Sequence, residues 1–155
     1  MSTFIKKFES IKQEWETPSV LFKKLDDIYH FTYDLAADEN NRKCSRYFSR
    51  EDSAFNHSWE GVCWLNPPYG TKEIKLTDWV KRAFIQAASY ESTIIMLIPA
   101  RTNTRWWHDY VMHSRRIWYI CGRPKFGGAD HGLPQPLVAV EFFRSEEKTE
   151  HLSLY

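Results

Sequence analysis

The fold is decided by the stretch Val62-Cys63-Trp64-Leu65-Asn66-Pro67-Pro68-Tyr69, in which an apolar run passes directly into two prolines. An apolar run of this length, bounded in this way, is typical of a buried strand. The prolines end the strand and stiffen the turn, because proline has no backbone N–H and restricts the residue before it. Asn66 and Tyr69 are therefore predicted at the carboxyl end of a strand, where open α/β sheets bind ligands.

Two side chains of this turn are suited to hold a planar, nitrogen-bearing group. The carboxamide of Asn66 has two N–H donors and a carbonyl acceptor, and Tyr69 presents a flat aromatic face and a hydroxyl. By themselves, residues 66–69 indicate only a site that grips an amine, and such a site is compatible with several substrates.

Apolar periodicity in the rest of the chain predicts strands and helices in alternation. The predicted strands cover residues 30–35, 62–65, 93–98, 117–121 and 137–143, with a short one at 47–48, and the predicted helices cover residues 18–28, 78–89 and 105–113. This alternation is typical of an α/β fold, a three-layer α/β/α sandwich with a Rossmann-like, mostly parallel sheet. The last two strands should form an antiparallel C-terminal hairpin, because the loop 122–136 is too polar and glycine-rich for a crossover helix.

Length and composition indicate a soluble protein with a single domain. A chain of 155 residues with 43% hydrophobic and 26% charged residues can bury one core and has little left for a second. We predict one domain over residues 1–155, with the polar segment 1–14 and the charged segment 144–155 flexible. The net charge of +1 gives no global signature of nucleic-acid binding, so phosphate contacts must come from a local cluster.

The cysteine, histidine and hydropathy patterns argue against several classes of protein. Cys44, Cys63 and Cys121 lie far apart without a C-x-x-C pair, and the six histidines have no metal-ligand spacing, which disfavours a disulfide framework and a metal site. No apolar run is long enough to cross a membrane, and residues 1–14 have no signal-peptide pattern. We therefore expect a protein of the reducing cytoplasm, with no metal and no membrane partner.

Five short motifs follow one another along the chain. They are Trp15-Glu16-Thr17-Pro18, Asp34-Leu35-Ala36-Ala37-Asp38, Trp64-Leu65-Asn66-Pro67-Pro68-Tyr69-Gly70, Leu97-Ile98-Pro99-Ala100-Arg101-Thr102 with Trp106-Trp107, and Gly122-Arg123-Pro124-Lys125-Phe126. In this combination the chain resembles the small phage-encoded DNA N-6-adenine methyltransferases over about residues 15 to 143. The resemblance implies a class I methyltransferase fold, S-adenosylmethionine as methyl donor, adenine in double-stranded DNA as substrate, and no separate target-recognition domain.

The resemblance assigns catalysis to Asn66, Pro67, Pro68 and Tyr69. The exocyclic amine of adenine is a poor nucleophile because it is conjugated with the ring. The Asn66 side-chain carbonyl and the Pro67 backbone carbonyl would accept its two hydrogens, so that the nitrogen lone pair points at the methyl group. Tyr69 would stack on the base once the base is flipped out of the duplex.

The first cofactor contact is expected at Asp34, at the end of the first strand. Its carboxylate would accept hydrogen bonds from the ammonium group of the cofactor; the alternative is an ordinary strand-end aspartate that bonds a loop amide. Ala36 and Ala37 have small side chains that would allow close approach to the backbone. The chain departs here from the wider methyltransferase class, which has a glycine-rich loop at this point, because no glycine lies between Asp34 and Gly61.

Two further cofactor contacts are predicted, one before the first strand and one after it. Thr17 and Pro18 match the segment that closes over the cofactor in the family; the alternative is a plain helix start, with Thr17 as N-cap and Pro18 as the first helical residue. An acidic partner for the ribose is expected in the polar stretch after the first strand, and we select Asp52 over Asp38 and Glu51.

Contacts with DNA are predicted from charge and position. Arg101 follows the central strand at the same edge of the sheet as Asn66, and with Arg105 it would form a local phosphate-binding patch. The alternative for each arginine is a solvated surface charge. Lys125 and Phe126 open the last hairpin and would reach a groove or the flipped base.

Two other functions stay open on the sequence. The same tetrapeptide serves methyltransferases that act on a protein glutamine or an RNA adenine, and a non-catalytic DNA-binding relative would keep the fold. A single small domain makes limited contact with a duplex, so we expect either a homodimer or low sequence specificity. The resemblance to phage proteins places the chain in the cytoplasm of a bacterial host cell.

Overall fold

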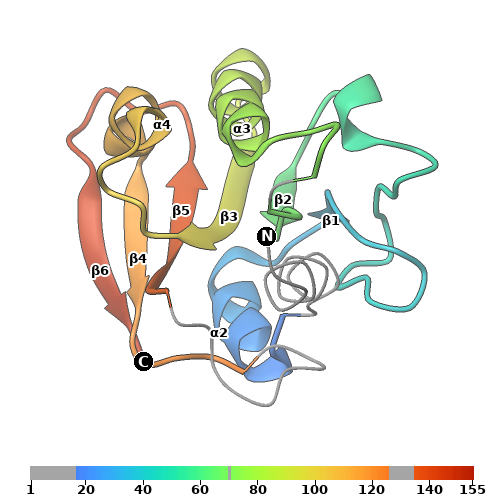
Figure 1. Cartoon of the computed structure of the whole chain (residues 1–155), viewed down its shortest axis with the longest axis horizontal. Helices are drawn as coiled ribbons and strands as arrows, with labels where there is room; N and C mark the ends of the chain where they lie inside the picture. Colours follow the sequence, from blue (N-terminus) through green and yellow to red (C-terminus); the bar gives the residue numbers. More distant parts are fainter. Residues whose placement is uncertain (1–16, 70, 126–134) are drawn as a thin grey trace, which may run out of the picture.

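The computed structural model of the chain describes residues 17–69, 71–125 and 135–155 (Figure 1). Its helices are α2 (Ser19–Tyr29), α3 (Leu76–Tyr90) and α4 (Arg105–Asp109), with the short 3-10 turns η1 (Ala54–Asn56) and η2 (Val111–His113). Its strands are β1 (Tyr33–Asp34), β2 (Val62–Leu65), β3 (Thr93–Pro99), β4 (Arg116–Ile120), β5 (Leu137–Phe142) and β6 (Glu150–Leu154). The described chain is therefore of the α/β class, as predicted.

The described strands form one mixed sheet in the order β1-β2-β3-β5-β4-β6. β1, β2 and β3 are parallel neighbours. β5 is antiparallel to both β3 and β4, which confirms the antiparallel pairing predicted for the two strands around 117–121 and 137–143. Because β5 lies between β3 and β4, the parallel strands and the C-terminal strands share one continuous sheet.

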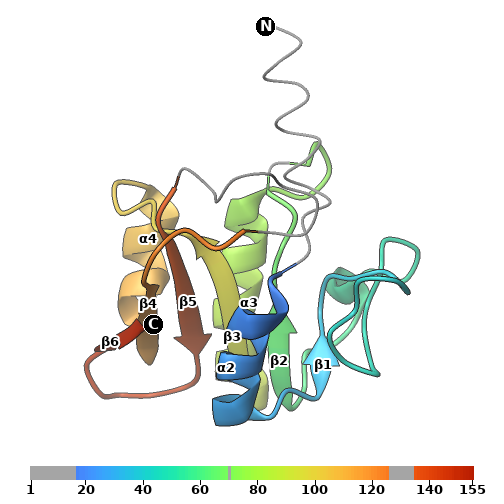
Figure 2. The ribbon, with the colours of Figure 1, turned by 90° about the horizontal axis from the view of Figure 1, so that it is seen from below.

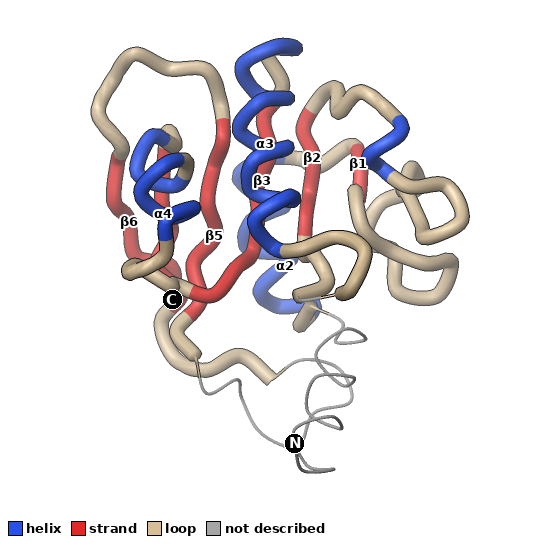
Figure 3. The backbone as a smooth tube through the Cα atoms, turned by 45° about the horizontal axis from the view of Figure 1, so that its top comes forward, coloured by secondary structure: helices blue, strands red, loops and turns tan. Residues whose placement is uncertain are grey.

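Helices cover both faces of this sheet, and side chains of the central strands alternate between the two faces. One buried cluster joins α3 and α4 to the sheet (Figure 3) and includes Cys63, Leu65, Trp79, Val80, Ile94, Met96 and Trp107. The other joins α2 to the opposite face (Figure 2) and includes Leu21, Leu25, Trp64, Ile95 and Leu97. Since both faces are covered, β3 is apolar almost throughout, as expected of a central strand.

The two helices after the Pro-Pro turn are of the predicted type, and α3 is also close to the predicted length. α3 confirms the predicted helix 78–89 and extends it at both ends. Thr104 caps α4 as predicted, because its side chain accepts a hydrogen bond from the Trp107 N–H. α4 ends at Asp109 and is followed by η2, so the predicted helix 105–113 is a short helix and a 3-10 turn.

The start of the described chain differs from the prediction. α2 begins at Ser19 with Pro18 as its N-cap (φ −55°, ψ 132°), and no side chain caps the helix. The prediction of Thr17 as N-cap is therefore wrong, because its hydroxyl is bonded to Asn66 instead. β1 keeps only Tyr33–Asp34 of the predicted strand 30–35, and the predicted strand 47–48 is reduced to a single bridge between Asp34 and Tyr47.

The C-terminal segment 144–155 was predicted to be flexible, and the structure corrects this prediction for Glu150–Leu154. These residues form β6, which pairs in parallel with β4. The many charged residues of the segment masked the pattern of this short strand in the sequence, although its last residue, Leu154, is buried in the core. Arg116 of β4 holds it in place: Nε donates to Glu150 of β6 at 2.8 Å, and Nη1 lies 3.3 Å from the buried carboxylate of Glu141 in β5.

Replacing Arg116 by Met leaves the Glu141 carboxylate buried without its cation. Burial already raises the pKa of Glu141, and the charge of Arg116 opposes that rise. We expect a loss of about 2 kcal/mol of unfolding free energy at pH 7 in denaturant titrations, below the range for fully buried pairs because solvent partly screens Arg116.

The pH dependence and a second variant control this prediction. Without Arg116 the folded-state pKa of Glu141 rises further above its unfolded value, so lowering the pH through the folded-state pKa should recover part of the loss. Arg116→Met combined with Glu141→Gln should lie closer to the wild type than Arg116→Met alone. A single variant as stable as the wild type at pH 7 would contradict the role of the pair.

Candidate active site

The carboxyl ends of β1, β2 and β3 lie side by side at one edge of the sheet (Figure 1). The parallel register pairs Asp34 of β1 with Trp64 of β2. Asn66 directly follows β2, and Arg101 comes shortly after the end of β3. The structure therefore brings Asp34, Asn66 and Arg101 to neighbouring strand ends, which is the placement that the sequence predicted, and ligand sites of open α/β sheets form at such ends.

The side chain of Asn66 is held by Thr17, the first described residue. Its Nδ2 atom donates to the Thr17 hydroxyl oxygen at 3.0 Å. Thr17 is only 4% exposed, and Pro67, the next residue of the turn, is also buried. Thr17 and Asn66 are thus direct neighbours in space although 49 positions separate them.

Tyr69 is fixed by both its ring and its hydroxyl. The ring packs against the core cluster on the α3 face, and the hydroxyl donates to the Leu97 carbonyl oxygen in β3 at 3.0 Å. Burial raises the pKa of Tyr69 far above its ordinary value, and the positive charge of nearby Arg101 opposes this rise. Tyr69 is therefore neutral at any physiological pH, and Arg101 lies close enough to act on it.

Arg101 also ties the far end of the long loop to β3. Its Nε and Nη2 atoms each lie 3.4 Å from the Gln135 side-chain oxygen. Next to it, the Ala100 N–H donates to the Pro136 carbonyl oxygen at 2.9 Å. Sequence reasoning missed Gln135, and only its position just before β5, which is antiparallel to β3, could have indicated that it lies at this edge.

Asp34 is almost fully buried and accepts two loop amides. Its carboxylate oxygens accept from the Ala36 N–H at 3.2 Å and from the Lys43 N–H at 2.9 Å. Burial raises the pKa of Asp34 to about 6, against the opposing effect of these two hydrogen bonds and of the Lys43 charge. Asp34 therefore does bond loop amides, which is the alternative that the sequence left open. Each carboxylate oxygen can accept further hydrogen bonds in addition to these two.

The two alanines after Asp34 lie between β1 and the loop that folds back along it. The Ala37 N–H donates to the Phe48 carbonyl oxygen at 3.0 Å, and the Phe48 N–H donates to the Asp34 carbonyl oxygen at 2.9 Å. Ala36 and Ala37 are half-buried. The segment that carries the cofactor prediction is thus held by backbone bonds without any glycine.

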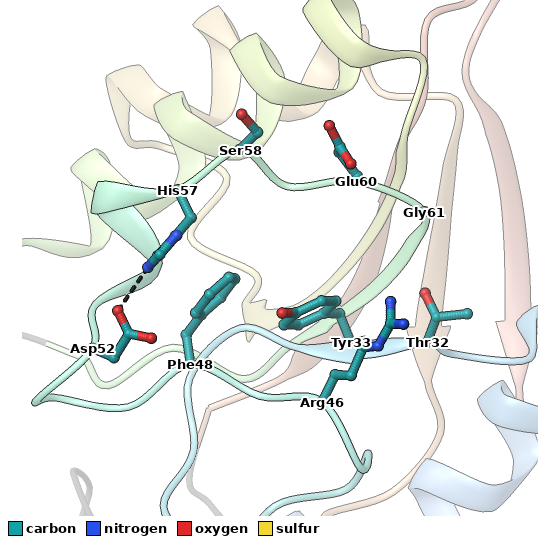
Figure 4. Close-up of a pocket in the computed structure, with 9 residues that line it drawn as sticks. All are labelled: Thr32, Tyr33, Arg46, Phe48, Asp52, His57, Ser58, Glu60 and Gly61. Carbon is teal, nitrogen blue, oxygen red and sulfur yellow. Dashed lines mark hydrogen bonds and ion pairs between the residues drawn. The ribbon is translucent and has the colours of Figure 1, made fainter.

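Asp52 lies beside β1, in a cavity of about 680 Å³ (Figure 4). Its carboxylate is 2.6 Å from Nε2 of His57. The rings of Tyr33, Phe48 and His57 stack in series, with centroids 4.8 and 4.5 Å apart. Neither Asn66 nor any other residue of the Pro-Pro turn lines this cavity, so the structure does not bring Asp52 together with the turn.

The remaining predicted contacts lie at the periphery. Arg105 is 92% exposed by its side chain and pairs with Asp109 at 3.4 Å, and Lys125 is exposed. Pro18 is half-buried at the start of α2. Phe126 lies outside the described residues. The arginine patch is therefore divided, since Arg101 is part of the site wall and Arg105 faces solvent.

Two kinds of feature are absent from the described ranges 17–69, 71–125 and 135–155. No group of three or more His, Cys, Asp and Glu side chains is arranged there to hold a metal ion. No helix in the same ranges is both long and apolar enough to span a membrane.

Comparisons with known proteins agree on one family. Residues 5–139 match the family model described as DNA N-6-adenine-methyltransferase (Dam). The chain is 30% identical over 115 residues to the DNA N-6-adenine-methyltransferase of Haemophilus phage HP1, covering 72% of this chain and 64% of that protein. It is 30% identical over 115 residues to the protein of the same name from Escherichia phage T1, covering 72% of this chain and 46% of that one. The chain thus spans less than two thirds of the length of these phage relatives.

Removing the Tyr69 hydroxyl tests the anchoring of the turn to β3. Tyr69→Phe loses the hydrogen bond to the Leu97 carbonyl and keeps the ring. We expect a loss of about 1 kcal/mol of unfolding free energy, measured by denaturant titration. The matched control is Tyr90→Phe, which removes the hydroxyl of an exposed tyrosine and should cost much less. Equal costs at the two positions would show that the Leu97 contact does not hold the turn.

Proposed function

This chain belongs to the family of DNA N-6-adenine-methyltransferases, and from this membership we propose that it transfers a methyl group from S-adenosylmethionine to the N6 amino group of adenine in double-stranded DNA. The observation that supports the proposal most directly is the position of Asn66 and Tyr69 at the carboxyl end of β2, between strand ends that carry Asp34 and Arg101. The names of the phage relatives support adenine as the target.

On the substrate side, Asn66 and Pro67 act on the amine. Their carbonyl oxygens accept the two N6 hydrogens, which draws the nitrogen out of conjugation and turns its lone pair toward the methyl donor. Tyr69, with its hydroxyl fixed on β3, stacks on the base that has left the duplex. Pro68 keeps the turn stiff. The nitrogen gains the methyl group as the bond between that methyl group and the donor sulfur breaks, and it releases one proton to water. The transfer is direct, so no covalent enzyme intermediate is needed.

On the cofactor side, Asp34 and the alanines after it suit the methionine part of S-adenosylmethionine. That part carries an ammonium group, and the Asp34 carboxylate has acceptor capacity beyond the amides of Ala36 and Lys43. The side chains of Ala36 and Ala37 end at Cβ and leave the backbone accessible. When bound, S-adenosylmethionine supplies an electrophilic methyl group on a positively charged sulfur.

The other cofactor contacts belong to the same proposal. Thr17 and Pro18 close the site from the start of α2, as the family resemblance implies. Asp52 is the proposed partner of the ribose, and for that role its carboxylate must share or leave its pair with His57. Since Asp52 is exposed, this rearrangement needs little unpacking.

The finer fold assignment is a class I methyltransferase, a three-layer Rossmann-like sandwich in a single domain. Doubly wound sheets of the Rossmann type run in the order 3-2-1-4-5-6. β1, β2 and β3 fit positions 1, 4 and 5 of that order, with β5 inserted antiparallel after them. On this alignment the switch point lies between β1 and β2, and Asp34 and Asn66 stand on its two sides.

The proposed partner is double-stranded DNA, approached through the edge that carries the strand ends. Arg101 beside Tyr69 faces the base, and Arg105 and Lys125 supply exposed positive charge for phosphates. Phe126 remains a proposed contact. A domain of this size makes limited contact with a duplex, so a homodimer or low sequence specificity follows from the limited contact area. The proposed place of action is the cytoplasm of a bacterial host cell.

Asn66→Ala tests the catalytic assignment. Loss of the amide acceptor should reduce tritium transfer from S-adenosylmethionine to unmethylated duplex DNA by about 100-fold or more, by analogy with the loss of one preorganised hydrogen-bonding partner at other catalytic centres. Asn56→Ala is the matched control, an asparagine of η1 that is exposed and away from the strand ends, and it should keep full activity. Full activity of Asn66→Ala would contradict the proposed role of Asn66 in catalysis.

A competition of substrates in the same assay tests the choice of adenine in DNA. Duplex DNA, RNA and a glutamine-containing protein are offered together with one labelled donor. The proposal predicts label in DNA adenine alone. Label in RNA or protein would overturn the substrate, and a wild-type protein that does not bind S-adenosylmethionine in calorimetry would indicate a non-catalytic DNA-binding protein.

The raised pKa of Asp34 predicts proton release on cofactor binding. The ammonium group favours ionised Asp34, so the bound pKa must lie below the value of about 6 in the free protein. Affinity should fall as pH drops below 6, by up to about tenfold per pH unit. Calorimetry in buffers of different ionisation enthalpy measures the released proton, and Asp34→Asn should bind more weakly and without this pH dependence. Proton uptake, or affinity constant between pH 5 and 7, would contradict the contact.

A further inference from the structure

The hydrogen bond between Thr17 and Asn66 joins the chain before α2 to the end of β2. From it we propose that Thr17 is a positioning residue for the reaction: its hydroxyl holds the Asn66 carboxamide with the carbonyl oxygen toward the adenine amine. The inference rests on the proposed function, and it assigns the Thr17 hydroxyl to Asn66, so that the closing contact with the cofactor is left to Pro18 and the rest of Thr17.

A carboxamide needs such a guide because its two ends are opposite in hydrogen bonding. Its terminal torsion has a broad, roughly two-fold preference, so the oxygen and nitrogen ends exchange places at little intrinsic cost. An amine substrate must meet the oxygen end, since the nitrogen end would set donor against donor. With Nδ2 directed at Thr17, 3.0 Å away, Oδ1 is the end on the far side from Thr17. An acceptor at this place therefore selects the productive orientation.

The position of Thr17 is well defined by packing. Thr17 is 4% exposed, so little water competes for its hydroxyl. Directly after it, Pro18 fixes the chain, and Leu21 of α2 packs in the same buried cluster as Trp64 of β2. Both ends of the bond therefore belong to elements that pack on each other, which is what holds a catalytic side chain within tight limits.

The missing cap of α2 supports the same reading. A threonine just before a proline at a helix start usually acts as the N-cap: its side-chain oxygen accepts a hydrogen bond from a backbone N–H of the first turn, worth about 1 kcal/mol. Here no side chain caps α2, and the Thr17 oxygen accepts from Asn66. The Thr17 hydroxyl is therefore used to hold Asn66 and not to cap α2.

The test uses Thr17→Val, which keeps the shape of the side chain and removes the hydroxyl, and Thr17→Ser, which restores it. With duplex DNA, Thr17→Val should lower kcat by about 10- to 100-fold, as small misplacements of a catalytic group do. The Kd for S-adenosylmethionine should change by less than about twofold, because the hydroxyl acts through Asn66. Thr17→Ser should recover most of kcat. In the Asn66→Ala background, Thr17→Val should have no further effect.

A readout independent of activity follows the bond itself. The side-chain NH₂ signals of Asn66 in ¹H–¹⁵N NMR should show slow exchange with water in the wild type and in Thr17→Ser, and faster exchange in Thr17→Val. Thr149→Val is the matched control, because the Thr149 hydroxyl also makes side-chain hydrogen bonds, to the Met112 and Ser114 carbonyl oxygens, and lies just before β6 at the other edge of the sheet. It should change stability while leaving kcat and the Asn66 signals as in the wild type.

Three results would overturn the inference. A weaker Kd for S-adenosylmethionine with unchanged kcat would assign the Thr17 hydroxyl to the cofactor instead of Asn66, and unchanged kcat with unchanged Kd would leave the hydroxyl with a structural role. Asn66 NH₂ signals that do not respond to Thr17→Val would show that the amide is not oriented by this bond. Failure of the proposed function can be distinguished from failure of this inference. If the proposed function is wrong, the wild-type protein is already inactive on every DNA, before any variant is compared.

Discussion

The parallel alignment of β1, β2 and β3 is the constraint on which the site depends. Each strand runs in the same direction, so each delivers its carboxyl end to the same edge. Burial enforces the alignment from both sides: Cys63 and Leu65 pack toward α3, whereas Trp64 packs toward α2. A slip of one residue in β2 would exchange these two faces and leave the tryptophan in the wrong cluster. The position of Asn66 follows from that register.

The turn after β2 is then held by side chains because its prolines cannot donate to a ladder. Three ties connect the edge to different elements. Asn66 reaches Thr17 before α2, Tyr69 reaches a carbonyl of β3, and Arg101 reaches Gln135 before β5. Such ties fix polar groups before a substrate arrives, which is the preorganisation that makes electrostatic stabilisation effective.

The sequence was sufficient where one strong pattern decided the structure. The apolar runs of β2 and β3 and the amphipathic α3 were predicted nearly to the residue, because burial on one or both faces leaves a periodic record. The neighbouring placement of Asp34 and Asn66 followed from the parallel order. The residues assigned to catalysis and the cofactor came from the family resemblance, and their roles stay predictions.

What the sequence did not reveal depends on contacts between distant positions. Thr17 looked like a helix cap, and only its tertiary partner 49 residues later shows that its oxygen is used elsewhere. β6 was hidden because charged residues surround it, and its pairing with β4 is held by the long-range tie from Arg116 to Glu150. Asp52 was chosen for its charge, and its pair with His57 could not be read from spacing alone.

We propose above that this edge of the sheet carries the methylation of adenine in DNA. Sequencing of modified bases in genomic DNA from cells that express the chain tests it most directly, with the empty vector as background. The account predicts N6-methyladenine at new sites that are absent from the background. DNA without new N6-methyladenine, from cells in which the folded chain is present, would contradict it.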